Sequence, residues 1–217
     1  MVQLLLEQIT VAPGRSLLLQ NVPWRQYESI LQELGQHRST RIAYDRGTIE
    51  LVTPLPQHEN SNRAIERFLA IITEELNLPL ESYGSTTLNR EDLQRGAEPD
   101  SCYYLRSQPS FQNGKLDLAT GAPPDLVVEI DITNRDLDKP ALYTQLGIPE
   151  FWRFDGVRLQ ILQLIDGHYQ DVTASPSFPG WVTETLLLDF LADCSETGTT
   201  TAVRQLRSHI QALMADT

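Results

Sequence analysis

The sequence contains little cysteine, fewer basic than acidic residues, and no long apolar segment. Its two cysteines, Cys102 and Cys194, lie far apart and outside any Cys-x-x-Cys or Cys/His spacing. This argues against a zinc module and a disulfide scaffold, and it favours a reducing cytoplasm. No apolar run approaches the roughly 18 to 20 residues that cross a bilayer. After Met1 a short apolar run ends at Glu7 with no basic region before it, so we expect neither a membrane span nor a secretory signal.

Basic residues are outnumbered, because 17 lysines and arginines face 29 aspartates and glutamates, for a formal net charge of −12. Such a chain repels a polyanion at long range. A protein that coats nucleic acid generally is therefore not expected. An enzyme that binds nucleic acid through a local basic groove, with a divalent cation at its centre, remains compatible with this charge.

The composition suits a folded domain, because 41% hydrophobic and 21% charged residues can form a core with a solvated surface. At 217 residues the chain has the length of one domain with small extensions, and it contains no internal repeat. We expect an N-terminal extension with a short helix over residues 1–40, a main domain over 41–190, and a C-terminal helical tail over 191–217.

Apolar periodicity and turn residues predict the order of the elements. Helical spacing is strongest in 58–76, and Gly35 and Gly147 suit the C-terminal ends of two further helices. Residues 45–47 form a plausible hairpin turn between two β-prone runs. This order predicts a mixed α/β or α+β domain built around one sheet. The expected helices cover 24–34, 58–76, 139–146 and 202–214; the strands cover 41–52 as a hairpin, 80–88, 100–105, 126–132, 151–154, 157–165 and 168–169; and the loops cover 89–96 and 109–124.

The segment 126–131 carries the clearest chemical signal. Side chains alternate faces along a strand, so Glu129 and Asp131 share one face with Val127, and the other face is wholly apolar. Such a strand is often half-buried with a solvated polar face. The presence of Val127 on the same face argues against this interpretation, because a carboxylate beside buried valines is costly unless it is paired or binds a metal. Asp100 and Lys139 are available as partners.

Four passages together are similar to the Uma-type family of restriction-endonuclease-like proteins, within the PD-(D/E)XK nuclease superfamily. Each is weak alone, but four in order at compatible spacing are specific. The similarity runs from about Ile42 to Tyr169 and includes Thr53-Pro54 and His58. The passages are Glu98-Pro99-Asp100, Pro124 to Thr133, Leu137 to Tyr143, and Leu146 to Asp155.

This resemblance implies a restriction-endonuclease-like core over 41–190, with a central mixed sheet flanked by helices. It places Asp100 and Glu129 on adjacent strands, where they hold a divalent metal with the backbone carbonyl of Ile130. Hard oxygen ligands suit Mg²⁺ or Mn²⁺. The metal would polarise a DNA phosphodiester and lower the pKa of the attacking water.

The chain departs from the superfamily pattern at one position, because the lysine expected two residues after Glu129 is Asp131. The resemblance points to Lys139, from the next helix, as its replacement. Spacing alone equally allows Lys139 to pair with Asp136 or Asp138 in solvent. Asp131 is either a further metal ligand or a partner of Lys139.

Other polar residues are accessory candidates. His58 could orient a phosphate or a water, or make a local polar contact at the start of its helix. Tyr143 lies one turn after Lys139 and shares its face, where packing is the favoured role. Asp125 lies about 13 Å from Glu129 along an extended strand, too far to share a metal, and is expected in a loop. Arg90, Arg95 and Arg106 could line a phosphate-facing rim or be scattered surface residues.

Two functions of different classes are consistent with these residues. The first is a metal-dependent endonuclease that acts on DNA, which the joint presence of Asp100, Glu129 and Lys139 favours. The second is a catalytically silent module for binding or assembly, which the net charge of −12 favours. We also expect a homodimer, from the resemblance and from an apolar helix over Leu206–Met214, and no association with membranes.

Overall fold

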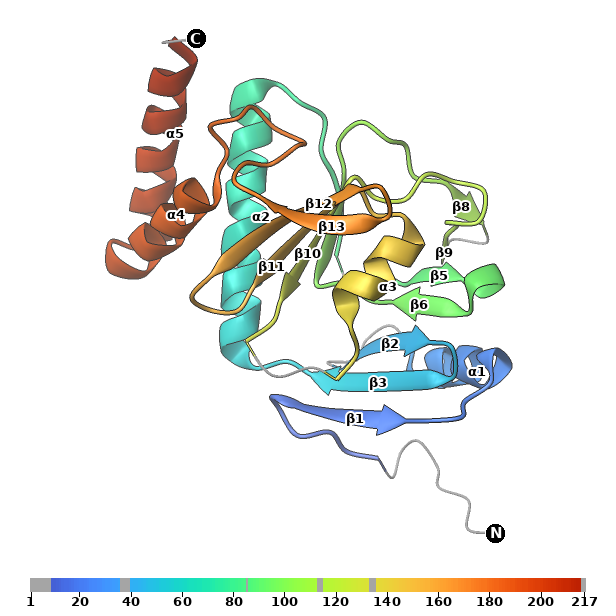
Figure 1. Ribbon diagram of the computed structural model, residues 1–217. Coiled ribbons are helices and arrows are strands. Elements are labelled where there is room, and N and C mark those ends of the chain that lie inside the picture. Colours follow the sequence, from blue (N-terminus) through green and yellow to red (C-terminus); the bar gives the residue numbers. More distant parts are fainter. Residues whose placement is uncertain (1–8, 36–39, 85, 113–114, 133–135, 216–217) are drawn as a thin grey trace.

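The computed structural model describes residues 9–35, 40–84, 86–112, 115–132 and 136–215 (Figure 1). The apolar run after Met1 and the end of one family motif at Thr133 lie outside these residues, as do parts of both expected extensions. The described chain forms two main β-sheets, a short hairpin and five α-helices. This arrangement confirms the expected α+β class.

The larger sheet is mixed and has helices on both faces. Strands β10 and β11 are parallel, whereas the other neighbours are antiparallel. Figure 1 shows α2 (Pro56–Leu76) crossing one face, and α3 (Lys139–Leu146) lies on the other side, in contact with β13. The strands are, in spatial order, β13 (His168–Val172), β12 (Leu159–Ile165), β11 (Glu150–Phe154), β10 (Leu126–Ile130), β7 (Ser101–Tyr104) and β4 (Glu81–Tyr83).

Strand β10 is buried on both faces. Leu126, Val128 and Ile130 pack with α2 in one cluster, and Val127 packs with α3 in another. Glu129, on the Val127 face, is only 2% exposed. The interpretation of this strand as half-buried with a solvated polar face is therefore wrong.

A second, antiparallel sheet holds the hairpin expected at 41–52. The expectation of one sheet is wrong here, because β2 pairs with β6 and not with a strand of the larger sheet. Helix α1 (Trp24–Leu34) covers one face, where Tyr27 stacks on Tyr44 with ring centroids 4.6 Å apart. The strands are, in spatial order, β1 (Arg15–Leu19), β3 (Thr48–Thr53), β2 (Arg41–Asp45), β6 (Arg95–Ala97) and β5 (Leu88–Arg90).

The chain moves between the two sheets within residues 80–104. The strand expected at 80–88 divides, because β4 joins the larger sheet and β5 joins the smaller one. The loop expected at 89–96 is in fact the β5–β6 hairpin, which turns through a short 3-10 helix (Glu91–Leu93). Residues 98–100 then connect β6 to β7. The loop expected at 109–124 also contains a small hairpin, β8 (Phe111–Gln112) and β9 (Lys115–Leu116).

Two helices complete the chain at its C-terminal end. Helix α4 (Glu184–Glu196) was not expected from the sequence, and the side chain of Thr183 caps it by accepting the Leu186 N–H at 3.3 Å. Helix α5 (Thr199–Ala215) packs against α2 and α4 and buries Leu206 and Ile210. Among the described residues, no helix is both long and apolar enough to span a membrane.

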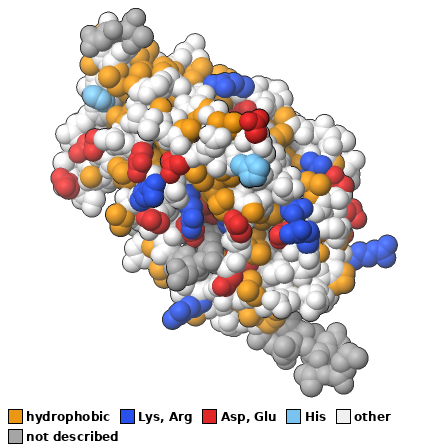
Figure 2. Space-filling model, viewed as in Figure 1, with side chains coloured by type: hydrophobic (Ala, Val, Ile, Leu, Met, Phe, Trp, Pro, Cys, Tyr) orange, Lys and Arg blue, Asp and Glu red, His pale blue; other side chains and the backbone are white. Residues whose placement is uncertain are grey.

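Charged side chains of both signs are interspersed on the face shown in Figure 2. This face carries no broad basic surface, in keeping with the net charge of −12. On this face, contact with a polyanion therefore depends on a few well-placed cations rather than on a general positive field.

Candidate active site

The pairing of β7 with β10 brings Asp100 and Glu129 together. In this antiparallel register Ser101 lies opposite Val128, and one further residue places Asp100 opposite Glu129. Opposed residues project from the same face of a sheet. The N–H of Ile130 donates to Asp100 Oδ2 at 2.8 Å, which joins the two segments at this point. Both carboxylates are 2% exposed.

Helix α2 contributes two polar residues beside Asp100. His58 Nε2 lies 2.9 Å from Asp100 Oδ2, so this histidine reaches the candidate carboxylate instead of making a contact within its own helix turn. One turn later, Asn62 Nδ2 donates to the Asp100 carbonyl at 3.4 Å, and Asn62 Oδ1 accepts from the Ser101 hydroxyl at 3.0 Å. The apolar residues later in α2 are buried in the core, so the position of these first two turns is fixed.

Lys139 forms an ion pair with Glu129. Its Nζ is 2.9 Å from Glu129 Oε1, and the Tyr143 hydroxyl donates to the same oxygen. The ammonium also lies 5.6 Å from the centroid of the Tyr143 ring. Tyr143 is fully buried, so it combines the expected packing role with a hydrogen bond to the site.

The alternative of a solvent-exposed Lys139 paired with a nearby aspartate is wrong. Lys139 is 5% exposed. Asp138 instead caps α3 by accepting the Ala141 N–H at 3.0 Å, and Asp136 accepts from the Ser16 hydroxyl at 2.7 Å.

Asp131, at the position of the missing lysine, forms an ion pair with Arg153. The guanidinium approaches Asp131 Oδ2 through Nε at 2.9 Å and Nη2 at 2.6 Å. Arg153 is the register neighbour of Glu129 on the adjacent strand β11, which explains why it can reach. Of the two alternatives for Asp131, a pair with Lys139 gives way to two other pairs, Asp131 with Arg153 and Glu129 with Lys139, whereas a role as metal ligand stays a prediction.

The three arginines considered for a phosphate-facing rim or for scattered surface positions have partners outside the site. Arg90 binds Asp92 with two hydrogen bonds, and Arg95 Nε lies 3.1 Å from Asp45. Arg106 Nη2 donates to the carbonyls of Pro176 and Ser177 at 3.3 and 3.0 Å.

Asp125 lies in a loop, as expected, and its hydrogen bonds are to that part of the chain and not to the candidate site. It accepts N–H groups from Leu105, Arg106 and Ser107 at 2.7 to 2.9 Å. Partial burial raises the pKa of Asp125, but these N–H donors outweigh burial and hold the pKa below its usual value.

Three residues beside the site were missed by the sequence analysis. Arg41 Nε lies 3.9 Å from Asp100 Oδ1. Glu98 accepts the Ile42 N–H at 3.2 Å and the Thr87 hydroxyl at 3.0 Å. The third is Glu50, on β3 of the smaller sheet.

Glu50, on β3, anchors the segment that leads into α3. Its Oε1 accepts the N–H of Asp136 at 2.6 Å and of Leu137 at 3.3 Å. Glu50 is 1% exposed. Its signal in the sequence was a single carboxylate inside the apolar run from Ile49 to Val52.

The oxygen donors at this site fit a hard divalent cation. Glu129 on β10 and Asp100, directly before β7, offer buried carboxylates, and Ile130 follows Glu129 directly in the chain. Mg²⁺ and Mn²⁺ prefer such ligands, and Mg²⁺ usually keeps several waters, so a small protein donor set suffices. In the described part of the chain, no group of three or more His, Cys, Asp or Glu side chains forms a metal cluster.

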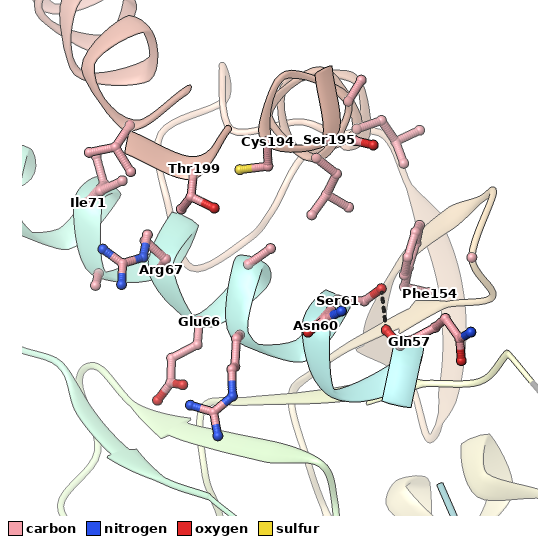
Figure 3. Close-up of a pocket in the computed structure, with 18 of the residues that line it drawn as sticks. Gln57, Asn60, Ser61, Glu66, Arg67, Ile71, Phe154, Cys194, Ser195 and Thr199 are labelled. Carbon is pink, nitrogen blue, oxygen red and sulfur yellow. Dashed lines mark hydrogen bonds between the residues drawn. The ribbon is translucent and has the colours of Figure 1, made fainter. Parts of the chain in front are cut away.

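A separate groove of about 1200 Å³ lies between α2, α4 and α5. Figure 3 shows Ser61 and Gln57 at one end of it, joined by a hydrogen bond of 3.2 Å from the Ser61 hydroxyl to the Gln57 carbonyl, with Cys194 and Thr199 on the opposite wall. Among the described residues, its lining includes none of Asp100, Glu129 and Lys139. This groove and the candidate catalytic residues are therefore distinct.

Comparison with known proteins identifies the family. No curated protein matches this chain. A family model named Uma2, with the description "Putative restriction endonuclease", matches residues 24–192, well over half of the 217 residues. The match begins at α1 and ends in α4, so it contains both sheets from β2 onward and every residue of the site described above. The chain therefore belongs to the Uma2 family of restriction-endonuclease-like proteins.

Proposed function

We propose that this protein is a metal-dependent endonuclease that hydrolyses phosphodiester bonds in DNA. The observation that carries the proposal is the buried contact of Lys139 with Glu129, directly beside Asp100. We take this lysine from α3 as the functional replacement for the strand lysine that the chain lacks. The family description supports a nuclease, and the chemistry of the carboxylates supports a metal.

Asp100, Glu129 and the Ile130 carbonyl would hold the cation, either Mg²⁺ or Mn²⁺. When bound, such an ion polarises a phosphodiester and makes water a stronger nucleophile at neutral pH.

The surrounding residues have separable tasks. Lys139 supplies a fixed positive charge that stabilises the charge developing on the phosphate or orients the attacking water. Tyr143 holds the Glu129 carboxylate to which Lys139 is bound. The Ile130 N–H and His58 fix the orientation of Asp100 through its Oδ2 atom. The pairs therefore preorganise the site before any substrate arrives.

We propose in addition that the protein works as a homodimer, which would join two such sites. The apolar helix that suggested this at the sequence level is accounted for within the chain, because Leu206 and Ile210 are buried against α2 and α4. The family resemblance is then the remaining support. Light scattering at micromolar concentration tests it, and a purely monomeric protein contradicts it.

The competing function is a catalytically silent module for binding or assembly. The specific observation in its favour is Asp131, which occupies the usual lysine position and binds Arg153. The net charge of −12 also weakens encounter with DNA.

The two functions separate in a cleavage assay combined with calorimetry. Single-stranded, double-stranded and branched DNA and RNA are incubated with Mn²⁺ or Mg²⁺, and Mn²⁺ binding is titrated in parallel. An endonuclease gives internal cuts, and Asp100→Asn abolishes both cleavage and metal binding. If the folded wild-type protein neither cleaves nucleic acid nor binds metal, the silent module remains as the function.

A further inference from the structure

Arg41 approaches the candidate active site from the smaller sheet. It is the first residue of β2, where side chains alternate between the two faces. Ile42 and Tyr44 pack into the cluster beneath α1, whereas Ala43 packs with Val127 on the opposite face. Arg41 shares the face of Ala43, and its guanidinium therefore extends toward Asp100.

The backbone around Arg41 is fixed relative to Asp100. The Glu98 N–H donates to the Ile42 carbonyl at 3.0 Å, and the Glu98 side chain accepts the Ile42 N–H at 3.2 Å. Glu98 precedes Asp100 by two residues, and Ile42 follows Arg41 directly. These two hydrogen bonds hold the arginine and the aspartate at a set separation, so their spacing is a property of the fold.

That separation leaves the guanidinium without a hydrogen bond to the carboxylate. Arg41 Nε lies 3.9 Å from Asp100 Oδ1, beyond hydrogen-bond length. The Nε atom is buried and, within the described part of the chain, it has no hydrogen-bond acceptor. Its side chain as a whole is 19% exposed, so the protein does not enclose it completely.

An unsatisfied buried donor is rare and calls for an explanation. Arg90, Arg106 and Arg153 differ, because all three donate to carboxylates or carbonyls. Among the described residues, Arg95 Nε also lacks a hydrogen bond, but it lies 3.1 Å from the Asp45 carboxylate, closer than Arg41 Nε lies to Asp100. A guanidinium has five N–H donors in a planar fork that matches the oxygens of a phosphate group.

We propose that Arg41 binds the phosphate group of the substrate beside Asp100, as the second cation of the site. The inference rests on the proposed endonuclease function and adds a residue from the smaller sheet to it. A phosphodiester would meet Lys139 from α3 and Arg41 from β2, on either side of the two carboxylates. Two fixed cations at this point offset the repulsion that Asp100, Glu129 and the net charge of −12 exert on DNA.

The rival explanation is that Arg41 serves only as an electrostatic neighbour of Asp100. The two roles differ in what they change. A phosphate ligand alters the salt dependence of DNA binding, since each phosphate contact adds about 0.9 to the slope of log K against log salt. A neighbour of Asp100 alters metal affinity and leaves that slope unchanged.

The experiment compares Arg41→Gln, Arg41→Lys and a control of equal charge change, Arg204→Gln. Arg204 is exposed on α5, which Figure 1 places away from β2. Binding of a fluorescent DNA duplex is measured by anisotropy at several salt concentrations, with Ca²⁺ as the metal. Mn²⁺ affinity is measured by calorimetry, cleavage is measured with Mn²⁺, and thermal unfolding checks that each variant folds.

We expect Arg41→Gln to reduce the salt slope by about 0.9, and kcat/KM by on the order of a hundredfold, with Mn²⁺ affinity within about twofold of wild type. Arg41→Lys keeps the charge, so it retains the slope and loses part of the affinity. Arg204→Gln matches wild type in every measurement.

An unchanged slope in Arg41→Gln together with altered Mn²⁺ affinity overturns the phosphate role and assigns Arg41 to Asp100. The same loss of slope in Arg204→Gln overturns it too, because the effect would then be one of net charge. Failure of the wild-type protein to bind or cleave any DNA refutes the proposed function itself, and the inference with it. Cleavage by wild type with unaffected Arg41 variants refutes the inference alone.

Discussion

Removal of the Lys139 ammonium is expected to destabilise the metal-free protein strongly. The carboxylate and the ammonium are 2% and 5% exposed, so Lys139→Ala leaves Glu129 as a buried charge. Breaking one side of a buried pair costs about 3 to 5 kcal/mol. The Tyr143 hydroxyl still donates to the same oxygen, so we expect the lower end, about 3 kcal/mol.

A bound metal should reverse much of this loss, because it supplies the positive charge that Glu129 has lost. The ammonium and a divalent cation also repel each other when both are present. Lys139→Ala should therefore bind Mn²⁺ about tenfold more tightly than wild type, which corresponds to about 1.4 kcal/mol. Cleavage should nevertheless fall by on the order of a hundred- to a thousandfold, since the charge that acts on the phosphate is gone.

The assay is urea unfolding with and without Mn²⁺, with Arg158→Ala as the matched control. Arg158 pairs with Asp171 at 3.0 Å, but the two side chains are 60% and 47% exposed. Loss of such a surface pair costs at most about 1 kcal/mol. A Lys139→Ala protein that loses no more than this control, or that Mn²⁺ stabilises no more than wild type, would refute the role of the ammonium as counter-charge of Glu129.

The sequence permits a direct observation of the same contact. Lys115 and Lys139 are its two lysines, so selective isotope labelling gives two lysine side-chain signals. Mg²⁺ should shift one of them, and that signal should be absent from Lys139→Ala. Glu129→Gln should abolish the shift, because it removes a proposed metal ligand. A Mg²⁺-dependent shift that persists in Glu129→Gln contradicts the assigned site.

Three further predictions test the scaffold of the site. Glu50→Leu removes the acceptor that holds the segment before α3 and should cost about 1 to 3 kcal/mol in urea unfolding, whereas Glu50→Gln, which keeps an acceptor oxygen, should cost less. Equal costs would contradict the anchoring role. The pKa of Asp125 is lowered in the folded state, so its contribution to stability is present above the unfolded pKa and is lost as the pH falls through the folded pKa. Asp125→Asn should therefore be less stable than wild type at pH 7 and approach it in acid; a deficit that is constant with pH would contradict this. Gly96→Ala places a Cβ 2.3 Å from Asn89 Oδ1 and should cost about 1 to 3 kcal/mol, while Gly180→Ala, with open space around it, should stay near wild type in thermal unfolding.

Local signals in the sequence were sufficient where a structure depends on neighbouring residues. The helix over Lys139–Leu146 has the expected bounds, because Pro140 and the glycine at 147 mark its ends. The faces of β10 followed from simple alternation, which placed Glu129 with Val127. Helix α4 was missed, since its run of three leucines from 186 to 188 carries no clear helical period.

Strand partners were harder to predict, because a pattern of side chains does not state which strand lies beside which. For this reason we expected a single sheet where the structure has two main sheets. Two charged residues were missed on the same ground: Arg41 and Glu50 act on groups that lie far along the chain, Asp100 and the segment that begins at Asp136. The family resemblance predicted that Lys139 reaches the site, and the lysine does contact Glu129, whereas spacing alone equally allowed a pair with Asp136 or Asp138 in solvent.

The link from β6 to β7 makes the geometry of the site depend on the assembly of both sheets. Residues 98–100 pass from one sheet to the other, so Asp100 takes its place only where both sheets are formed. The contact of Lys139 with Glu129 spans 10 residues, whereas that of Asp136 with Glu50 spans 86. Closing the longer loop costs more chain entropy, so we expect the lysine contact to form early in folding and the anchoring contact to form when the sheets dock. The smaller sheet contributes the contacts that hold Glu98 and Asp136, so its partial unfolding should silence the site while the larger sheet stays intact.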